Sequence, residues 1–477
     1  MDDAMKRVSR ERLEPAFKLH KEQNFNMIRN WTGQSTEEVL YELCDEYGMM
    51  VFNDFWMSTT DFNVPPADYR LLMSNIKDAV KRFRNHPSIA IWCARNEGFA
   101  PEQVETQLMD LLITEDGTRH YLPTSIKVNT TDSGPWESHD PNMYSDSNSN
   151  LFPQGFKTEM GTASMPTLRT ALKFMEKEDL WPIADVWNYH DWHVNAWPGF
   201  QHFQQRLDGL YGKSNNAEEF LSWAQLENFR AWRAMSEASN GSLWSNTTGY
   251  LYWLSHPSWP STVWQTYTYD FETTGAYYGA KHACEPLHIQ MNIATKKVQA
   301  LNVSSKNSDL SAKFTIYTLK GEVIKSETKA LQLASNTIAD CFDISTVQLP
   351  ENQLYILRLT LTNKAGKQVS TNDYWLQAKG CKDYQSLKTV GTADVKILKT
   401  SLQKDGTYLV KIKNNSSILA LGVKLNLMNS QTKTYVLPAF FSDGFFSMLP
   451  NEERDIQLTD CKELTGMEIT VEGLNFK

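Results

Sequence analysis

The 477-residue sequence has no apolar stretch approaching the roughly 20 residues of a membrane-spanning helix, so we expect no membrane partner. It also has no run of lysine or arginine, and its formal charge of −9 disfavours a nucleic-acid partner. A composition of 41% hydrophobic and 22% charged residues excludes a disordered, collagen-like or disulfide-scaffold protein. The first residues, MDDAMKRVSRERLE, lack the apolar core of a signal peptide. A chain of this length predicts two or three globular domains.

Cysteine is scarce and dispersed. The six cysteines form no CxxC pair, which argues against a zinc site or a disulfide framework, and we expect buried thiols at Cys44, Cys93, Cys284, Cys341, Cys381 and Cys461. No glycine-rich phosphate loop follows a predicted strand, which disfavours an open nucleotide-binding sheet. A G-x-S-x-G elbow is missing as well, which disfavours a Ser-His-Asp hydrolase.

Tryptophan and histidine are concentrated in one part of the chain. Fourteen of the fifteen Trp and all ten His precede residue 291, and only Trp375 lies in the remaining 187 residues. Indoles and imidazoles gather at ligand sites and in large cores. The first 290 residues are therefore predicted to carry the chemistry.

Helical and apolar segments alternate in these 290 residues. Ser35, with Glu38 three residues on, predicts a helix start, and Gly48 predicts its end before a buried strand at 49–53. A helical stripe over 69–83 then precedes a second buried strand at 88–93. Further strands are predicted at 24–29, 121–126, 155–158 and 249–254. This alternation predicts a parallel α/β sheet.

Polar residues follow the predicted strands: Arg29-Asn30, Asn53-Asp54, Asn96-Glu97, Glu159 and Ser255-His256. The active site of a (β/α)8 barrel lies at the carboxyl ends of its strands. We therefore predict a TIM-type barrel in residues 1–290.

The hydrophobic period changes to two after Met291. Short alternating segments separated by turn residues predict two antiparallel sandwiches of about a hundred residues each, similar to immunoglobulin domains. We place them at 291–384 and 385–477. Both are interpreted as structural rather than sugar-binding, with Phe440, Phe441, Phe445 and Phe446 packing against the barrel.

Glu97 and Glu159 each follow a predicted buried strand. Glycoside hydrolysis needs two carboxyl groups, one that protonates the leaving oxygen and one that attacks or activates water. The segments IWCARNEG (91–98) and GFKTEMGTASMP (155–166) resemble the acid/base and nucleophile motifs of glycoside hydrolase family 2. Within it, the chain is most similar to the branch of β-mannosidases, mannosylglycoprotein endo-β-mannosidases and exo-β-D-glucosaminidases, and VLPAFFSDGFFSMLP (436–450) resembles that branch's C-terminal module.

The resemblance implies a retaining double displacement with Glu97 as acid/base and Glu159 as nucleophile, and no cofactor or metal. It also implies that Asn96 bonds the sugar 2-hydroxyl. A charged Glu159 roughly 5 Å away would raise the pKa of Glu97. The Asn96-Glu97 pair favours a β-mannoside substrate over a β-glucosaminide.

Other candidate site residues have two possible roles, one functional and one structural. Arg29 and Asp54 could pair to position the nucleophile or the sugar, or form a structural ion pair. Trp31, Trp187, Trp192, Trp253 and Trp264 could be sugar platforms or core residues, with Trp253 and Trp264 favoured for function. In WNYHDWH (187–193), Tyr189 or His190 could contact substrate, and a metal site at His190 and His193 is disfavoured.

In family 2, two β-rich domains and the first barrel strand precede the region that corresponds to Arg12. We therefore expect this chain to lack the first barrel strand and to have little glycosidase activity until that region is restored. Relatives lead us to expect a periplasmic or secreted protein. The alternatives are an exo-β-D-glucosaminidase, a catalytically silent carbohydrate-binding or structural fragment, or an adhesin with a vestigial barrel. The oligomeric state cannot be predicted from this sequence.

Overall fold

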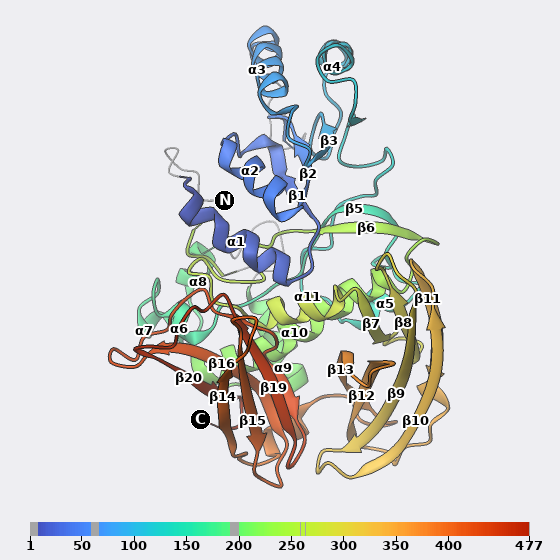
Figure 1. Cartoon of the computed structure of the whole chain (residues 1–477), viewed down its shortest axis with the longest axis vertical. Helices are drawn as coiled ribbons and strands as arrows, with labels where there is room; N and C mark the ends of the chain where they lie inside the picture. The colour runs from blue at the N-terminus through green and yellow to red at the C-terminus, as the bar shows by residue number, and fades with distance from the viewer. Residues whose placement is uncertain (1–7, 59–65, 191–199, 258, 263, 477) are drawn as a thin grey trace. The chain divides into compact units, whose positions relative to one another are not determined.

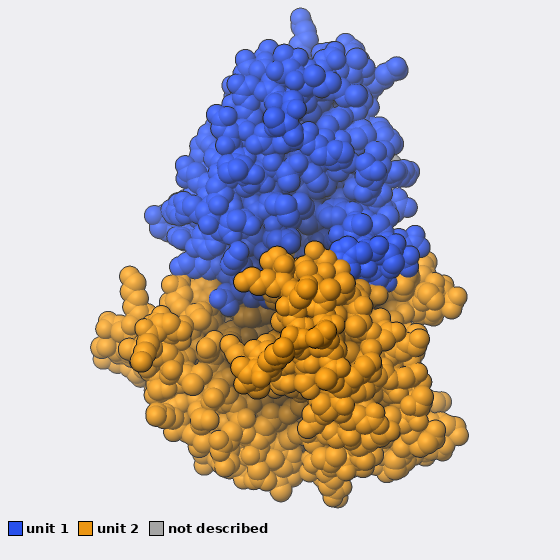
Figure 2. Space-filling view, turned by 45° about the vertical axis from the view of Figure 1, so that its right-hand side comes forward, with its two compact units in different colours: residues 1–136, 153–161, 242–254 blue, residues 137–152, 162–241, 255–477 orange. Residues whose placement is uncertain are grey.

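The computed structural model describes residues 8–58, 66–190, 200–257, 259–262 and 264–476 (Figure 1). The chain divides into two units (Figure 2). Unit 1 comprises residues 1–136, 153–161 and 242–254, and unit 2 comprises 137–152, 162–241 and 255–477. No helix among the described residues is both long and apolar enough to cross a bilayer.

Unit 1 is built on parallel strands. Its strands are β1 (Met27–Asn30), β2 (Met50–Asp54), β3 (Ile89–Cys93), β4 (His120–Leu122), β5 (Gly155–Met160) and β6 (Thr247–Tyr252). The first four pair in chain order in one sheet, and β5 pairs with β6 in another. A parallel bridge between Thr131 and Lys157 joins the segment after β4 to β5. Strands therefore form at each of the six predicted places, with ends that differ by a few residues.

The strands of unit 1 enclose an apolar core. Phe52, Cys93, Leu122 and Leu251, from β2, β3, β4 and β6, are buried together, and Met27, Ile91 and Phe156 pack against them. Apolar side chains from all six of these strands thus fill the space below the carboxyl ends, as in the interior of a packed barrel.

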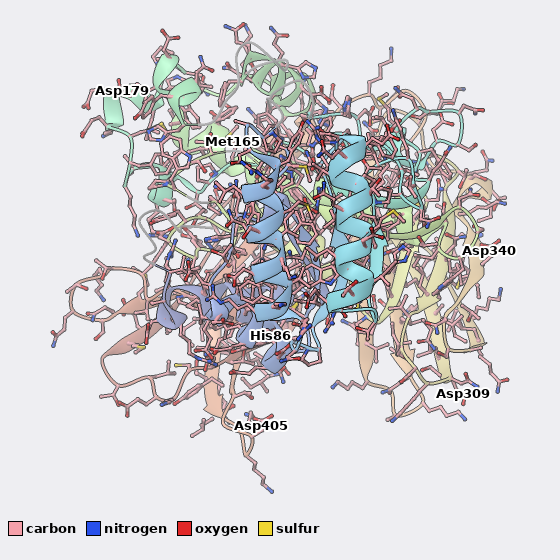
Figure 3. The ribbon with its side chains drawn as sticks, turned by 90° about the horizontal axis from the view of Figure 1, so that it is seen from above. His86, Met165, Asp179, Asp309, Asp340 and Asp405 are labelled. Atoms are coloured by element: carbon pink, nitrogen blue, oxygen red, sulfur yellow. The ribbon has the colours of Figure 1, made fainter. Side chains whose placement is uncertain are left out.

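Helices α1 (Arg10–Glu22), α2 (Glu38–Tyr47), α3 (Tyr69–Phe83) and α4 (Glu102–Glu115) accompany this sheet. Asp68 caps α3 by accepting from the backbone N–H groups of Arg70 and Leu71, and α3 buries the predicted apolar stripe. Figure 3 shows α3 and α4 side by side, with His86 beyond the end of α3. There the His86 Nδ1 atom lies 2.7 Å from Asp45 Oδ2.

The predicted capping role of Ser35 is wrong. Helix α2 begins at Glu38 after Glu37, without a side-chain cap. Ser35 is instead held by Asn30, whose Oδ1 accepts from the Ser35 N–H at 3.0 Å and whose Nδ2 donates to the Ser35 carbonyl at 2.8 Å. The backbone of Ser35 therefore closes a loop at the end of β1. Gly48 ends α2 in the left-handed conformation, as predicted.

The helices of unit 2 gather around one long buried helix. They are α5 (Asn142–Ser145), α6 (Leu168–Ala171), α7 (Lys177–Leu180), α8 (Asp185–Tyr189), α9 (Phe200–Tyr211), α10 (Ala217–Asn240) and α11 (Gly275–Ala283). Helix α10 packs closely on α11, and two glycines of α11 allow this approach. A Cβ atom at Gly275 or Gly279 would lie only 2.0 or 2.3 Å from a backbone oxygen of α10. Helix α10 also contacts the first sandwich, where the Tyr374 hydroxyl donates to Glu237 at 2.7 Å.

Two antiparallel sandwiches complete unit 2. The first contains β7 (Leu287–Met291), β8 (Lys297–Asn302), β9 (Ser308–Thr318), β10 (Val323–Leu333), β11 (Thr337–Asp343), β12 (Leu354–Asn363) and β13 (Gln368–Gln377), with the 3-10 turn η3 (Ile344–Thr346). Its sheets have the orders β10-β9-β12-β13 and β11-β8-β7. Strand β7 pairs with β8, so this sandwich already includes residues before the predicted boundary at 291.

The second sandwich follows the 3-10 turn η4 (Gln385–Thr389). It contains β14 (Val395–Leu402), β15 (Tyr408–Asn414), β16 (Ala420–Asn429), β17 (Phe440–Phe441), β18 (Phe446–Met448), β19 (Glu453–Thr459) and β20 (Met467–Glu472). Its sheets have the orders β14-β15-β19-β17 and β18-β16-β20. The domain bounds 1–290, 291–384 and 385–477 stay predictions.

Several side-chain predictions need correction. All six cysteines are free, but only Cys44, Cys93 and Cys341 are buried, and the others are half-buried. Phe441 and Phe446 belong to the core of the second sandwich. Phe445 does pack on α11, with its ring centroid 6.2 Å from that of Tyr278.

Candidate active site

Arg29 is the centre of a charged cluster at the carboxyl ends of the strands of unit 1. Its guanidinium donates to Asp54 through two bonds, Nε to Oδ1 at 3.2 Å and Nη2 to Oδ2 at 2.7 Å. Its Nη1 donates to Glu159 Oε1 at 2.9 Å, and Nη2 also donates to Asn96 Oδ1 at 2.7 Å. One planar donor group from β1 thus fixes side chains from β2, β5 and the segment after β3.

This cluster is buried. The Arg29 and Glu159 side chains are each 5% exposed, and that of Asp54 is 0% exposed. Burial lowers the pKa of Arg29, but the adjacent Asp54 and Glu159 raise it above its ordinary value. The predicted Arg29–Asp54 pair is therefore present, and Arg29 also contacts the predicted nucleophile.

The turn after β1 completes the enclosure of Asp54. Residues Trp31–Gly33 form the 3-10 turn η2, and the Thr32 N–H donates to Asp54 Oδ2 at 2.9 Å. Gly33 has a φ of +63°, and a Cβ atom there would lie 2.7 Å from the Asp54 carbonyl oxygen. Only glycine allows this close approach without a shift of the backbone.

Glu159 lies near the end of β5, where its charge is unfavourable. Burial raises its pKa, Arg29 opposes that effect, and the negative charges of Glu97 and Asp54 raise it further, to about 7. The charge of Glu97 therefore acts on Glu159.

Glu97 lies in the segment after β3 and is half-buried. Its φ of +46° places it in the left-handed region, which is uncommon for a residue with a Cβ atom. Its N–H donates to Ser125 Oγ at 2.9 Å, and the Ser125 hydroxyl donates to Asn96 Oδ1 at 3.3 Å. Asn96 is buried and receives a second bond from Arg29, so the two carboxylate segments are joined by hydrogen bonds.

Two predicted tryptophans also lie in unit 1. The Trp31 and Trp253 rings meet edge to face, with centroids 5.1 Å apart. The Trp31 Nε1 atom is buried without a hydrogen-bond partner. The Trp253 backbone N–H donates to the Met160 carbonyl at 2.9 Å, so Trp253, the first residue after β6, is bonded to the end of the strand that carries Glu159.

The other predicted contacts belong to unit 2. Tyr189 is 74% exposed, and the buried His190 stacks on Trp259, with ring centroids 5.2 Å apart. Trp264 is half-buried. These three stay predictions as substrate-binding residues.

The two remaining tryptophans named as candidate sugar platforms are Trp187 and Trp192. Trp187 is 0% exposed and packs against Phe200 and Phe220, so it is a core residue and not a platform. Trp192 and His193 lie outside the described residues. The described part of the chain holds no group of three or more His, Cys, Asp or Glu side chains arranged to bind a metal ion.

Sequence reasoning missed Ser125 and Thr158. The Thr158 hydroxyl donates to the Ser125 carbonyl at 3.0 Å, which links β5 to the segment after β4. The rule that found Asn96 and Asp54, polar residues directly after a strand, also applies to Ser125, which follows β4. The predicted strand extended to Ile126 and hid that signal.

Three family models match the chain. Residues 2–127 match the TIM barrel domain of glycosyl hydrolases family 2, residues 295–379 match the mannosidase Ig/CBM-like domain, and residues 372–476 match the exo-β-D-glucosaminidase Ig-fold domain. The chain thus has a TIM barrel domain of the glycosyl hydrolases family 2 type, followed by two immunoglobulin-like domains.

Curated relatives come from the predicted branch. A mannosylglycoprotein endo-β-mannosidase of Lilium longiflorum is 28% identical over 471 residues, covering 84% of this chain and 48% of the relative. An exo-β-D-glucosaminidase of Arthroderma benhamiae is 24% identical, covering 99% of this chain and 58% of the relative. The chain thus spans about half the length of these two relatives.

Solved structures share the fold. An exo-chitosanase from Amycolatopsis orientalis superposes with a TM-score of 0.89 at 22% identity, covering 98% of this chain and 61% of that protein. A β-D-mannosidase from Dictyoglomus thermophilum gives a TM-score of 0.80 at 22% identity, covering 99% and 59%.

Proposed function

We propose that this chain carries the catalytic carboxylates of a retaining β-glycosidase that hydrolyses O-glycosyl bonds of oligosaccharides or glycosides. The observation that carries the proposal is the buried Glu159 carboxylate, held by Arg29 at 2.9 Å and repelled by the charge of Glu97. The match of residues 2–127 to the TIM barrel domain of glycosyl hydrolases family 2 independently supports a glycoside hydrolase activity.

The two carboxyl groups have different neighbours, which assigns their roles. The Arg29 guanidinium donates to Glu159 and favours its negative charge, so we assign Glu159 as the nucleophile and Glu97 as the acid/base. Glu159 then attacks the anomeric carbon while Glu97 protonates the leaving oxygen. Glu97, which gave up its proton in the first step, then acts as the base that activates the water that hydrolyses the glycosyl-enzyme.

The substrate that we propose is a β-mannoside. Two observations support it, the Asn96-Glu97 pair and the match of residues 295–379 to a mannosidase domain. The match of residues 372–476 to an exo-β-D-glucosaminidase domain favours a second candidate, a β-glucosaminide.

Hydrolysis of aryl β-mannoside, β-glucosaminide and β-galactoside by the wild type, Glu97→Gln and Glu159→Gln tests the proposal. It predicts that each substitution lowers kcat by at least about 100-fold, because removal of a general acid or a nucleophile has effects of this size. A chain that binds the glycosides without hydrolysing them would support the silent carbohydrate-binding alternative. The preferred aryl glycoside would identify the sugar.

A further inference from the structure

Ser125 contacts both segments that carry the two catalytic glutamates. It follows β4 and is 0% exposed. Its Oγ accepts from the Glu97 N–H at 2.9 Å and donates to Asn96 Oδ1 at 3.3 Å, and its N–H donates to the Arg95 carbonyl at 3.0 Å. Its carbonyl accepts from the hydroxyl of Thr158 at 3.0 Å. The segments after β3 and at the end of β5 are thus tied to one buried residue.

The contact with the Glu97 N–H matters because of the backbone conformation there. At a φ of +46° the backbone of Glu97 is strained, and such a conformation persists only when surrounding contacts hold it. The Ser125 hydroxyl supplies the acceptor that the Glu97 N–H meets in this conformation. Loss of that acceptor removes a contact that opposes relaxation of the main chain toward negative φ.

The contact with Asn96 fixes the direction of its amide group. Asn96 Oδ1 accepts two hydrogen bonds, from Arg29 Nη2 at 2.7 Å and from the Ser125 hydroxyl at 3.3 Å. Two donors on one oxygen prevent the amide from turning over, because the NH₂ group would then face both donors. Ser125 therefore acts on the side chain before Glu97 as well as on the main chain of Glu97.

We propose that Ser125 is a positioning residue for the acid/base step, whose hydroxyl holds the Glu97 main chain and the Asn96 amide in the orientation that directs the Glu97 carboxyl toward the leaving oxygen. The inference rests on the glycosidase function proposed above. Because Ser125 acts through Glu97, its loss slows the reaction most where the leaving group needs a proton.

The test compares Ser125→Ala with Ser88→Ala. Ser88 is a matched control, because it is also a buried serine beside β3 but precedes that strand, whereas Glu97 follows it. Glycosyl-enzyme formation is measured with the aryl glycoside that the wild type prefers, carrying either phenol, a poor leaving group, or 2,4-dinitrophenol, which leaves without a proton. Ser125→Ala is expected to slow the phenyl glycoside roughly 10- to 100-fold and the dinitrophenyl glycoside less than about 3-fold.

Each other outcome is decisive. If Ser125→Ala slows both glycosides equally, or hydrolyses both at the wild-type rate, the positioning role is overturned. Partial recovery of the phenyl glycoside rate in Ser125→Thr, which restores the hydroxyl, supports that role. Ser88→Ala is expected to leave both rates unchanged. Glu97→Gln in the same assay separates the two proposals, since full activity in that variant contradicts the proposed function regardless of Ser125.

Discussion

Replacing Glu159 with glutamine removes a buried negative charge while keeping the length and the hydrogen-bonding oxygen of the side chain. Burial and the charges of Glu97 and Asp54 raise the pKa of Glu159 from its ordinary 4.5 to about 7, despite the opposing effect of Arg29. At about 1.4 kcal/mol per pH unit, the interval between these two pKa values corresponds to about 3 kcal/mol of folding free energy.

The sign follows from proton binding. The folded protein binds this proton more tightly than the unfolded chain, so the wild type loses stability as pH rises from about 4.5 to about 7 and does not regain it above that range. Glutamine does not ionise, and Glu159→Gln escapes this loss. We subtract the free energy of unfolding of the wild type from that of Glu159→Gln. This difference should be about 3 kcal/mol larger at pH 8 than at pH 4.5, in favour of the stability of the variant.

Denaturant unfolding of both proteins at the two pH values measures this difference. Glu42→Gln, which changes an exposed carboxylate, is the control, and its difference from the wild type should stay nearly constant. The electrostatic reasoning would be refuted if the difference in free energy of unfolding between Glu159→Gln and the wild type does not change with pH, or changes in the opposite direction. The expected gain in stability comes with loss of hydrolysis, because the negative charge of Glu159 destabilises the folded protein but is needed for the reaction.

Three further predictions concern other charged groups. Arg29→Met leaves its carboxylate partners unpaired and should lower the free energy of unfolding by about 3–5 kcal/mol, measured by denaturant titration. Glu97→Gln should lower the pKa of Glu159, since one repelling charge is lost; carbon NMR titration measures this, and an unchanged pKa would contradict the coupling. Lys424 lies 2.7 Å from the buried Glu272. Lys424→Met should therefore destabilise the protein by about 3 kcal/mol, and adding Glu272→Gln should recover part of that loss in thermal unfolding, unless the pair is uncoupled.

The sequence predicted most of the parallel strands because their signals are local. The helix stop at Gly48 and the helical stripe over 69–83 are set by the preferences of neighbouring residues, and both precede strands where predicted. The start of α2 was missed for the opposite reason. Ser35 has the type and spacing of a capping residue, but its backbone groups bond to Asn30 from the preceding strand, and that tertiary contact decides its conformation.

The candidate site was predicted only in part. Residues directly after strands, such as Asn96 and Asp54, could be found because the carboxyl ends of parallel strands meet at one edge. The sequence could not show that Arg29 contacts Asp54, Asn96 and Glu159 together, because the reach of one guanidinium depends on strand register. Nor could it separate Trp187, a core residue, from the other tryptophans, since burial depends on how distant segments pack.

The central claim is that Glu159 forms a covalent bond with the cleaved sugar while Glu97 transfers the proton. A 2-deoxy-2-fluoro β-mannosyl donor with a 2,4-dinitrophenyl leaving group slows the second step and traps the intermediate. Peptide mass spectrometry of the treated protein should locate a fluoromannosyl ester on Glu159, and Glu159→Gln should remain unlabelled. An ester on another residue, or turnover of the dinitrophenyl glycoside by Glu159→Gln at the wild-type rate, would contradict the account.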